Sequence, residues 1–330
     1  MNVGIIGCGK QAEKHINGYR AHGIEDIFVT DISPEAVKKL SADMNVKGVD
    51  TLDALLTNPA ISMLDICTPT PSHAQLIEAA INSGKDFLVE KPLCEDFKQA
   101  QNLQAKIAEK NCIGAVGFTY RFAPSLVKIK DILLDEQAPL GDIISATFRI
   151  GGRGSHASWK HLIERGGGAI QEMAIHMIDL AVWYFGPMAK VDLVHCDLKH
   201  PQRQIGGTIH DVDAEDDVII KLTSQQGVNI AIIADFTTPS FTQYAEIQGR
   251  NGMAFGSIQP SFAPFIAINQ PVGSYEKGHQ ALDIQPTNIV ADLIGDFVNS
   301  VQKKKQARGT IEDSVEVQRI SDLLLNKARS

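Results

Sequence analysis

Several features that would point to a particular environment or partner are scarce in this chain. It has five cysteines, an odd number with no CxxC pair, which argues against a disulfide framework and favours free thiols in a reducing compartment. No apolar run reaches the length of a membrane span, and no charged leader with an apolar core precedes the first predicted strand. Positive charge is not in excess, because the net charge is -8. We therefore expect a cytoplasmic protein with neither a nucleic-acid nor a membrane partner.

The 330 residues, 44% of them hydrophobic, can bury a sizeable core and at usual domain sizes predict two domains. Over residues 1–122, short apolar segments such as NVGIIG, DIFVTD and SMLDICT alternate with helical stretches. This alternation predicts an α/β Rossmann domain with a doubly wound parallel sheet and a ligand crevice at the carboxyl ends of its strands. Over 123–330, longer strands and an Asn-Gly turn predict an α+β domain with a mostly antiparallel open sheet, whose closing helices could pack back on the first domain.

The loop after the first predicted strand reads GCGKQA and places Gly7, Gly9 and Ala12 in the G-x-G-x-x-G/A pattern. Gly7 would allow the tight turn and Gly9 the close passage of a pyrophosphate. The backbone amides at the start of the following helix would meet the phosphate charge. These amides belong to Lys10, Gln11 and Ala12. An ordinary glycine-rich turn is the alternative interpretation.

The second predicted strand ends in Asp31, about 20 residues after the loop, where a dinucleotide site places the acid that binds the adenosine ribose. Ile32 and Ser33 follow it, so a 2′-phosphate would face a carboxylate without a cationic partner. The sequence therefore favours NAD over NADP.

The stretch RGGGAIQEMAIHMIDLAVWYFG, residues 165–186, places three glycines before an apolar helix that carries polar groups. Glu172, His176 and Asp179 are spaced i, i+4 and i+7, which predicts one helical stripe. One interpretation is a core helix in which His176 and Asp179 satisfy each other. The other is a functional face, with the glycines giving a ligand room and His176 supplying a base with a suitable intrinsic pKa.

Two later strand ends carry Thr68-Pro69, followed by His73, and the triplet Glu90-Lys91-Pro92. Together with GGGAIQEMAIHMID, these motifs resemble the family of glucose-fructose oxidoreductase and inositol dehydrogenase. The members of that family are pyridine-nucleotide enzymes that act on sugars, cyclitols and their derivatives. The resemblance covers nearly the whole chain, including YRFAP at 120–124 and EIQGRNGM at 246–253.

The resemblance implies roles for individual residues. Lys91 would reach the substrate hydroxyl and the nicotinamide region, and His176 would be the proton-handling histidine. Glu172 stands where inositol dehydrogenase-like members carry an aspartate, so its reach is one methylene longer. It would orient His176 or accept a hydrogen bond from a substrate hydroxyl. The further cofactor contacts implied are Thr68, Pro69, His73 and Glu90, with His73 shaping the loop rather than doing chemistry. The further substrate contacts are Arg121 and Trp159.

The segment before the glycines is rich in positive charge and histidine. Its members are Arg149, Arg153, His156, Trp159, Lys160, His161 and Arg165. This segment could receive a carboxylated, phosphorylated or nucleotide-linked sugar, or it could be a solvated loop balanced by nearby acids. Neither its histidines nor HCDLKH at 195–200 has the spacing of a metal site, so we expect no metal.

These observations predict an NAD-dependent oxidoreductase that transfers hydride between nicotinamide and a ring hydroxyl or keto carbon of a sugar, cyclitol or sugar derivative. The resemblance implies a homodimer or homotetramer formed through the open sheet. Two alternatives remain. One is redox-assisted glycoside cleavage with retained NAD, and the other is a non-catalytic NAD-binding regulator.

Overall fold

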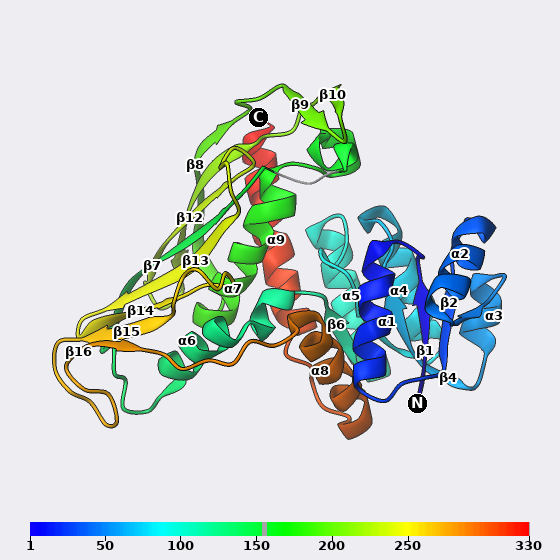
Figure 1. Cartoon of the computed structure of the whole chain (residues 1–330), viewed down its shortest axis with the longest axis horizontal. Helices are drawn as coiled ribbons and strands as arrows, with labels where there is room; N and C mark the ends of the chain where they lie inside the picture. The colour runs from blue at the N-terminus through cyan, green and yellow to red at the C-terminus, as the bar shows by residue number, and fades with distance from the viewer. Residues whose placement is uncertain (154–156, 330) are drawn as a thin grey trace. The chain divides into compact units, whose positions relative to one another are not determined.

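The computed structural model describes residues 1–153 and 157–329 and divides into two compact units (Figure 1). The first unit contains Met1–Phe122 and Asn288–Gln318, and the second contains Ala123–Thr287 and the chain from Arg319 onward. All five cysteines are free, which confirms the expectation from their spacing. No helix in the described ranges is both long and apolar enough to cross a membrane.

The first unit is built on a six-stranded parallel sheet of order β3-β2-β1-β4-β5-β6. The strands are β1 (Asn2–Ile6), β2 (Ile27–Thr30), β3 (Lys47–Gly48), β4 (Ile61–Ile66), β5 (Asp86–Val89) and β6 (Gly114–Val116). The strand order reverses between β1 and β4, and such a switch point is where open α/β sheets bind ligands, beyond the carboxyl ends of the strands. The parallel sheet confirms the predicted Rossmann fold.

Helices cover this sheet. They are α1 (Lys10–Ala21), α2 (Pro34–Met44), α3 (Leu52–Thr57), α4 (His73–Asn82), α5 (Phe97–Lys110) and α8 (Ile289–Lys303). α1 packs against α8, and α4 packs against α5. Ile5, Ile16 and Phe297 are completely buried in the core between β1, α1 and α8. α2 starts as its sequence predicts, because the Ser33 hydroxyl accepts a hydrogen bond from the Ala36 amide and Pro34 occupies the first turn.

The second unit contains an eight-stranded sheet of order β16-β15-β14-β13-β7-β12-β11-β8, in which only β7 and β12 run parallel. The strands are β7 (Ile143–Gly151), β8 (Met188–Asp197), β11 (Asp217–Ser224), β12 (Asn229–Asp235), β13 (Thr242–Gly249), β14 (Gly252–Gly256), β15 (Phe265–Ile268) and β16 (Gly278–Ala281). A separate hairpin joins β9 (Gln202–Ile205) and β10 (Thr208–Asp211). The mostly antiparallel sheet confirms the predicted α+β domain.

One face of the eight-stranded sheet is covered by α6 (Pro124–Leu134) and α7 (Ile175–Phe185) (Figure 1). β11 shows the reason, because Val218, Ile220 and Leu222 are completely buried while the residues between them face the other side. The last helix, α9 (Ile311–Ala328), contributes residues to both units. Short helical segments are η1 (Thr70–Ser72), η2 (Thr119–Phe122), η3 (Ser158–His161), η4 (Ile163–Arg165) and η5 (Ile170–Ala174).

Candidate cofactor and substrate sites

The glycine loop between β1 and α1 has the geometry that a dinucleotide pyrophosphate requires. Gly7 has φ +98°, and a Cβ at this position would lie 2.8 Å from the Cys67 carbonyl oxygen. A side chain is therefore excluded there on both grounds. A Cβ at Gly9 would meet no atom within 4 Å, so the backbone before α1 can be approached closely. The amino terminus of α1 follows at Lys10, and the residues present thus fit the phosphates of NAD.

Asp31 ties the end of β2 to this loop. Its Oδ2 accepts a hydrogen bond from the Cys8 amide at 2.7 Å, and its Oδ1 accepts one from the Ser33 amide at 2.9 Å. Each carboxylate oxygen keeps a second lone pair, so the group can also accept hydrogen bonds from ribose hydroxyls. Burial and the charge of Asp31 raise the pKa of Cys8 to about 11, and the thiol is therefore neutral beside the loop.

Substituting Asp31 should change the cofactor preference. In Asp31→Ser we expect the Kd for NADH to rise about tenfold, because hydrogen bonds from the ribose to a charged acceptor are lost. The Kd for NADPH should fall relative to that for NADH, since the carboxylate that repels a 2′-phosphate is gone. Fluorescence titration with both cofactors measures the ratio, and Asp31→Asn separates the loss of charge from the loss of the loop contacts. An unchanged ratio in both variants would contradict the role of Asp31.

The loops that follow β4 and β5 are joined by His73. Its Nδ1 lies 2.8 Å from the Pro92 carbonyl oxygen, and its Nε2 lies 2.9 Å from the Thr68 carbonyl oxygen. Burial lowers the pKa of His73 despite these two acceptors. The side chain therefore links the segment that carries Thr68-Pro69 to the segment that carries Lys91. These contacts support the predicted role of His73 in shaping the loops. The cofactor contacts of Thr68, Pro69 and Glu90 stay predictions.

A polar cluster in the first unit was missed by the sequence analysis. His15 of α1 and Asp65 of β4 are both completely buried, and His15 Nδ1 lies 2.8 Å from Asp65 Oδ2. Glu90 and Gln11, which the sequence assigned to the cofactor site, belong to the same cluster through a 2.8 Å hydrogen bond from the Gln11 amide group. The signal was present in the sequence, because a histidine on the apolar side of α1 and an aspartate within the strand SMLDI each need a buried partner.

The predicted polar helix of the second unit begins with a π turn. η5 is a π-helix over Ile170–Ala174, and regular α-helix starts at Ile175. The α-helical spacing behind the predicted stripe therefore holds for His176 and Asp179 in α7, while Glu172 lies in the π turn, and a shared face for all three stays a prediction. Asp179 is 1% exposed, whereas Glu172 and His176 are half-buried. Glu172 Oε2 lies 2.5 Å from Lys160 Nζ, a pair that joins the preceding segment to the π turn.

The three glycines before the π turn serve packing more than ligand access. A Cβ at Gly167 would lie 2.3 Å from the Lys160 carbonyl oxygen, and one at Gly168, where φ is +117°, would lie 2.4 Å from Glu215 Oε1. Only the position of Gly166 is open, with φ +71°. The prediction that the triplet gives a substrate room is thus corrected for Gly167 and Gly168. Glu215 was not predicted, and it caps the π turn by accepting a hydrogen bond from the Ile170 amide at 3.0 Å.

Most of the positive charge before the glycines is paired within the second unit. Arg149 forms an ion pair with Asp235, and Lys160 forms one with Glu172. The exposed Arg165 lies 3.5 Å from Glu164. The charged segment therefore matches the expectation of a loop balanced by nearby acids.

The remaining members of this segment have other contacts. Arg153 Nε donates a hydrogen bond to the Pro239 carbonyl oxygen. His161 is 2% exposed and packs edge-on against the Phe236 ring at 4.8 Å. His156 lies outside the described residues.

Arg121 is removed from the predicted substrate contacts. Its side chain is completely buried in the first unit, and Nη1 donates hydrogen bonds to the Arg308 carbonyl oxygen at 2.9 Å and to Asp313 Oδ2 at 2.6 Å. A buried guanidinium needs such partners to offset its desolvation. Arg121 therefore anchors the returning segment 288–318 in the first unit, a role that depends on residues almost 200 positions away.

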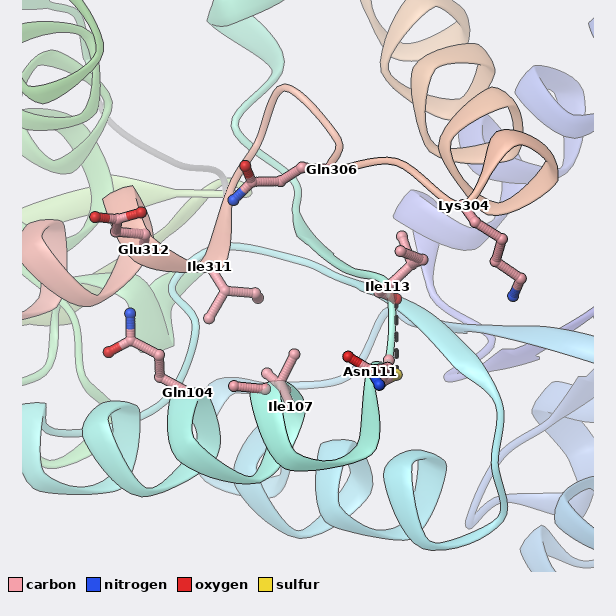
Figure 2. Close-up of a pocket in the computed structure, with 10 residues that line it drawn as sticks. Gln104, Ile107, Asn111, Ile113, Lys304, Gln306, Ile311 and Glu312 are labelled. Atoms are coloured by element: carbon pink, nitrogen blue, oxygen red, sulfur yellow. Dashed lines mark hydrogen bonds between the residues drawn. The ribbon is translucent and has the colours of Figure 1, made fainter.

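A cavity of about 530 Å³ lies in the first unit, beside the end of α5 and the connection between α8 and α9. Figure 2 shows the side chains that line it. Asn111 and Ile113 border it just before β6 begins. In a parallel sheet this position lies at the amino edge, opposite the edge where the cofactor loop emerges. Its lining residues are not among the predicted site residues, and we assign it no part in the reaction.

The sequence matches two profiles of one family. Residues 1–118 match "Oxidoreductase family, NAD-binding Rossmann fold", and residues 129–255 match "GFO/IDH/MocA C-terminal domain". The inositol 2-dehydrogenase of Rhizobium meliloti is 24% identical over 327 residues, which span 98% of this chain and 95% of that protein. The dTDP-3,4-didehydro-2,6-dideoxy-alpha-D-glucose 3-reductase of Actinomadura kijaniata is 25% identical over 339 residues, spanning 100% and 96% of the two chains.

Among solved structures, a levoglucosan dehydrogenase in complex with NADH and L-sorbose superposes with a TM-score of 0.88 at 20% identity, covering 100% of this chain and 96% of that one. This likeness shows the shared fold. The fold, the glycine loop and the family profiles define an NAD-binding oxidoreductase. The chain belongs to the GFO/IDH/MocA family, as its motifs predicted.

Proposed function

We propose that this oxidoreductase transfers hydride between NAD and a ring hydroxyl or keto carbon of a sugar or cyclitol. The relatives named for inositol, levoglucosan and a dTDP-sugar support this class of substrate. NAD supplies the hydride chemistry when it is bound. The protein must then hold the ring, move the hydroxyl proton and stabilise the oxygen that becomes charged.

The observation that carries the proposal is a group of side chains in the second unit. The Trp159 ring is 42% exposed, and Lys160 Nζ lies 5.2 Å from its centroid. Lys160 is held in turn by Glu172 at 2.5 Å. An accessible aromatic face, a donor and an acceptor on neighbouring residues suit a ring that carries both C–H faces and hydroxyl groups. His176 follows Glu172 by four residues and is also half-buried.

Lys91 and His176 are the residues we propose for the proton step. In oxidation, a neutral His176 accepts the hydroxyl proton, because its ordinary pKa lies near neutrality. The Lys91 ammonium stabilises the negative charge that develops on the oxygen as the proton leaves, and departure of the hydride from the carbon then turns this alkoxide into a neutral carbonyl. Reduction runs the same transfers in reverse. Glu172 then has a binding role, since its contact with Lys160 engages one side of the carboxylate.

The pairing of the positive charges favours an uncharged ring over an anionic one. Lys160, Arg149 and Arg165 each have an acidic partner within the second unit. A carboxylated or phosphorylated sugar would have to compete with these acids for the same cations. We therefore propose neutral sugars and cyclitols as the first substrates to test, with uronates and nucleotide-linked sugars as the comparison.

Breaking the contact between Lys160 and Glu172 should affect substrate binding more than chemistry. In Lys160→Met we expect KM for the sugar to rise about tenfold with kcat within about threefold, because a hydrogen bond made in both the ground and transition states is lost. Arg165→Met, whose partner is exposed, is the matched control and should leave KM unchanged. A loss confined to kcat in Lys160→Met would contradict a binding role.

The proposal is tested by following nicotinamide absorbance while purified protein, NAD and a panel of cyclitols, free sugars, uronates and nucleotide sugars react. Turnover with at least one ring compound supports the proposal. Cofactor that stays on the protein through purification, with substrate consumed and no net NADH, would point to a closed redox cycle. Tight NADH binding without reaction on any compound in either direction would contradict catalysis and favour a regulator.

We also propose that the open face of the eight-stranded sheet mediates self-association into a homodimer or homotetramer. Half-buried aromatic rings lie on this face, where Phe255 stacks on Phe265 with centroids 5.4 Å apart and Tyr244 lies 5.4 Å from Phe255. Val194, 62% exposed on β8, adds apolar surface at the other end of the sheet. Such a surface is typical of an interface between subunits.

A further inference from the structure

A histidine lies between two carboxylates inside the first unit. His15 is completely buried, with Nδ1 2.8 Å from Asp65 Oδ2 and Nε2 3.1 Å from Glu90 Oε1. The second contact is an ion pair rather than a directed hydrogen bond. A neutral imidazole has only one N–H, so a ring with a carboxylate oxygen at each nitrogen is fully satisfied only as the imidazolium.

Other polar groups around the ring do not remove this charge. Cys67 Sγ lies 3.5 Å from His15 Nδ1, and burial raises the pKa of that thiol to about 12, so it is neutral. The Tyr19 hydroxyl lies near Asp65, and burial likewise raises its pKa. Burial, the largest single effect, lowers the pKa of His15, but its neighbours, Asp65 foremost, together outweigh burial and hold the pKa well above its ordinary value of 6.5.

Glu90 connects the His15 imidazolium to the predicted cofactor site. Burial would raise its pKa, but His15, the Gln11 amide and Lys91 hold the pKa at about 2. Gln11 Nε2 donates a hydrogen bond to Glu90 Oε1 at 2.8 Å. Gln11 and His15 both belong to α1, which begins at the glycine loop, and Glu90 directly precedes Lys91. Two side chains of one helix thus hold the strand end that carries the EKP triplet.

We propose that His15 is a positioning residue: as a buried imidazolium it fixes Glu90, and through Glu90 it sets the strand end bearing Lys91 against the dinucleotide loop. This role concerns cofactor binding and does not depend on the identity of the substrate. The direction in which pH changes the contact between His15 and Glu90 follows from the geometry. The contact is complete below the raised pKa of His15 and is lost as the pH rises through that value.

The charge is tested directly on the intact wild-type protein. Imidazole carbon and nitrogen shifts of labelled histidine report the protonation state of each of the ten histidines, and His15 is identified through its sequential connection to Ile16. We expect its ring to remain cationic at about pH 8, where an ordinary histidine is neutral. A ring that titrates at or below about 6.5 would overturn the proposal.

Two variants distinguish an effect of His15 on the position of Glu90 from an effect on the stability of the protein. The readouts are the Kd for NADH and the melting temperature. His15→Gln leaves the buried Asp65 and the partly buried Glu90 without their cation, so it should lower the melting temperature and raise the Kd for NADH about tenfold. His15→Gln with Asp65→Asn removes one of these charges and should recover much of the melting temperature. If His15 positions Glu90, the Kd stays raised in this double variant. If the Kd returns with the melting temperature, the role is merely structural and the proposal fails.

A double-mutant cycle of His15→Gln and Glu90→Gln tests whether His15 acts on cofactor binding through Glu90. Glu90→Gln alone should raise the Kd for NADH by a similar factor, and adding His15→Gln should raise it little further, because both act through one contact. Independent, multiplying effects would contradict the proposal. A stoichiometric metal ion in the purified protein that is lost with Cys67→Ala would also overturn it, since a metal would then supply the positive charge assigned to the ring.

Discussion

His176→Asn is expected to lower kcat about 10²- to 10⁴-fold while leaving the Kd for NADH unchanged. The Kd should not change because His176 belongs to the second unit, whereas the glycine loop and Asp31, which are proposed to bind NADH, belong to the first. A neutral amide cannot accept the hydroxyl proton as a base does. The limb of the pH profile in which oxidation rises as a histidine loses its proton should therefore disappear in the variant.

Two further variants complete this prediction. Lys91→Met should also lose most of the turnover, and its remaining pH dependence should still show the histidine limb, because His176 is intact. His195→Asn changes a histidine of the same unit that lies on β8 and contacts Asp217, so it serves as the matched control with near wild-type kcat. Stopped-flow nicotinamide absorbance over a range of pH, with a ring compound that the panel identifies, gives these values. If His176→Asn retains both its rate and its pH limb, another group is the base.

Gly167→Ala is expected to destabilise the second unit by about 3 kcal/mol, the upper end for overpacking a tight site. The added Cβ would lie 2.3 Å from the Lys160 carbonyl oxygen and 2.4 Å from its carbonyl carbon, and backbone atoms cannot move aside as a flexible side chain can. Relief of the contact would shift Lys160, so the KM for the sugar should rise as well.

Gly166→Ala is the control for this substitution. Its Cβ would meet no atom within 4 Å, so the cost is only that of placing alanine at φ +71°, about 1 kcal/mol. Both tryptophans, Trp159 and Trp183, lie in the second unit, and their fluorescence during urea unfolding reports on that unit alone. Equal losses of unfolding free energy in the two variants would contradict the close-packing role of the glycine triplet.

Local rules predicted much of the fold and the cofactor loop. The tight turn at Gly7 and the parallel sheet over residues 1–122 each follow from short stretches of sequence, and the structure confirms them. The acid at Asp31 was also found from spacing alone. Its hydrogen bonds to the Cys8 and Ser33 amides show that it organises the loop, and its contact with the ribose stays a prediction.

Sequence patterns do not predict a side chain's role where its partner is remote in the sequence or the helix is irregular. Arg121 was expected to contact the substrate because of the family resemblance, and its buried partner, Asp313, lies 192 positions later in the sequence. The His15 cluster joins residues 50 and 75 positions apart, which no local pattern connects. The π turn at Ile170–Ala174 interrupts the regular helical period from which the stripe was predicted. Charge pairing within the second unit likewise could not be read from composition, since it depends on the fold.

The central claim is direct hydride transfer between a ring carbon and NAD, and isotope transfer tests it most directly. The protein is incubated with unlabelled NAD and ring-deuterated inositol or glucose, and the NADH formed is analysed by mass spectrometry. Direct transfer gives NADH that carries one deuterium from the ring, formed by the wild type and greatly reduced in Lys91→Met and His176→Asn. NADH without the label, or no transfer from any deuterated ring compound while NAD is demonstrably bound, would contradict it.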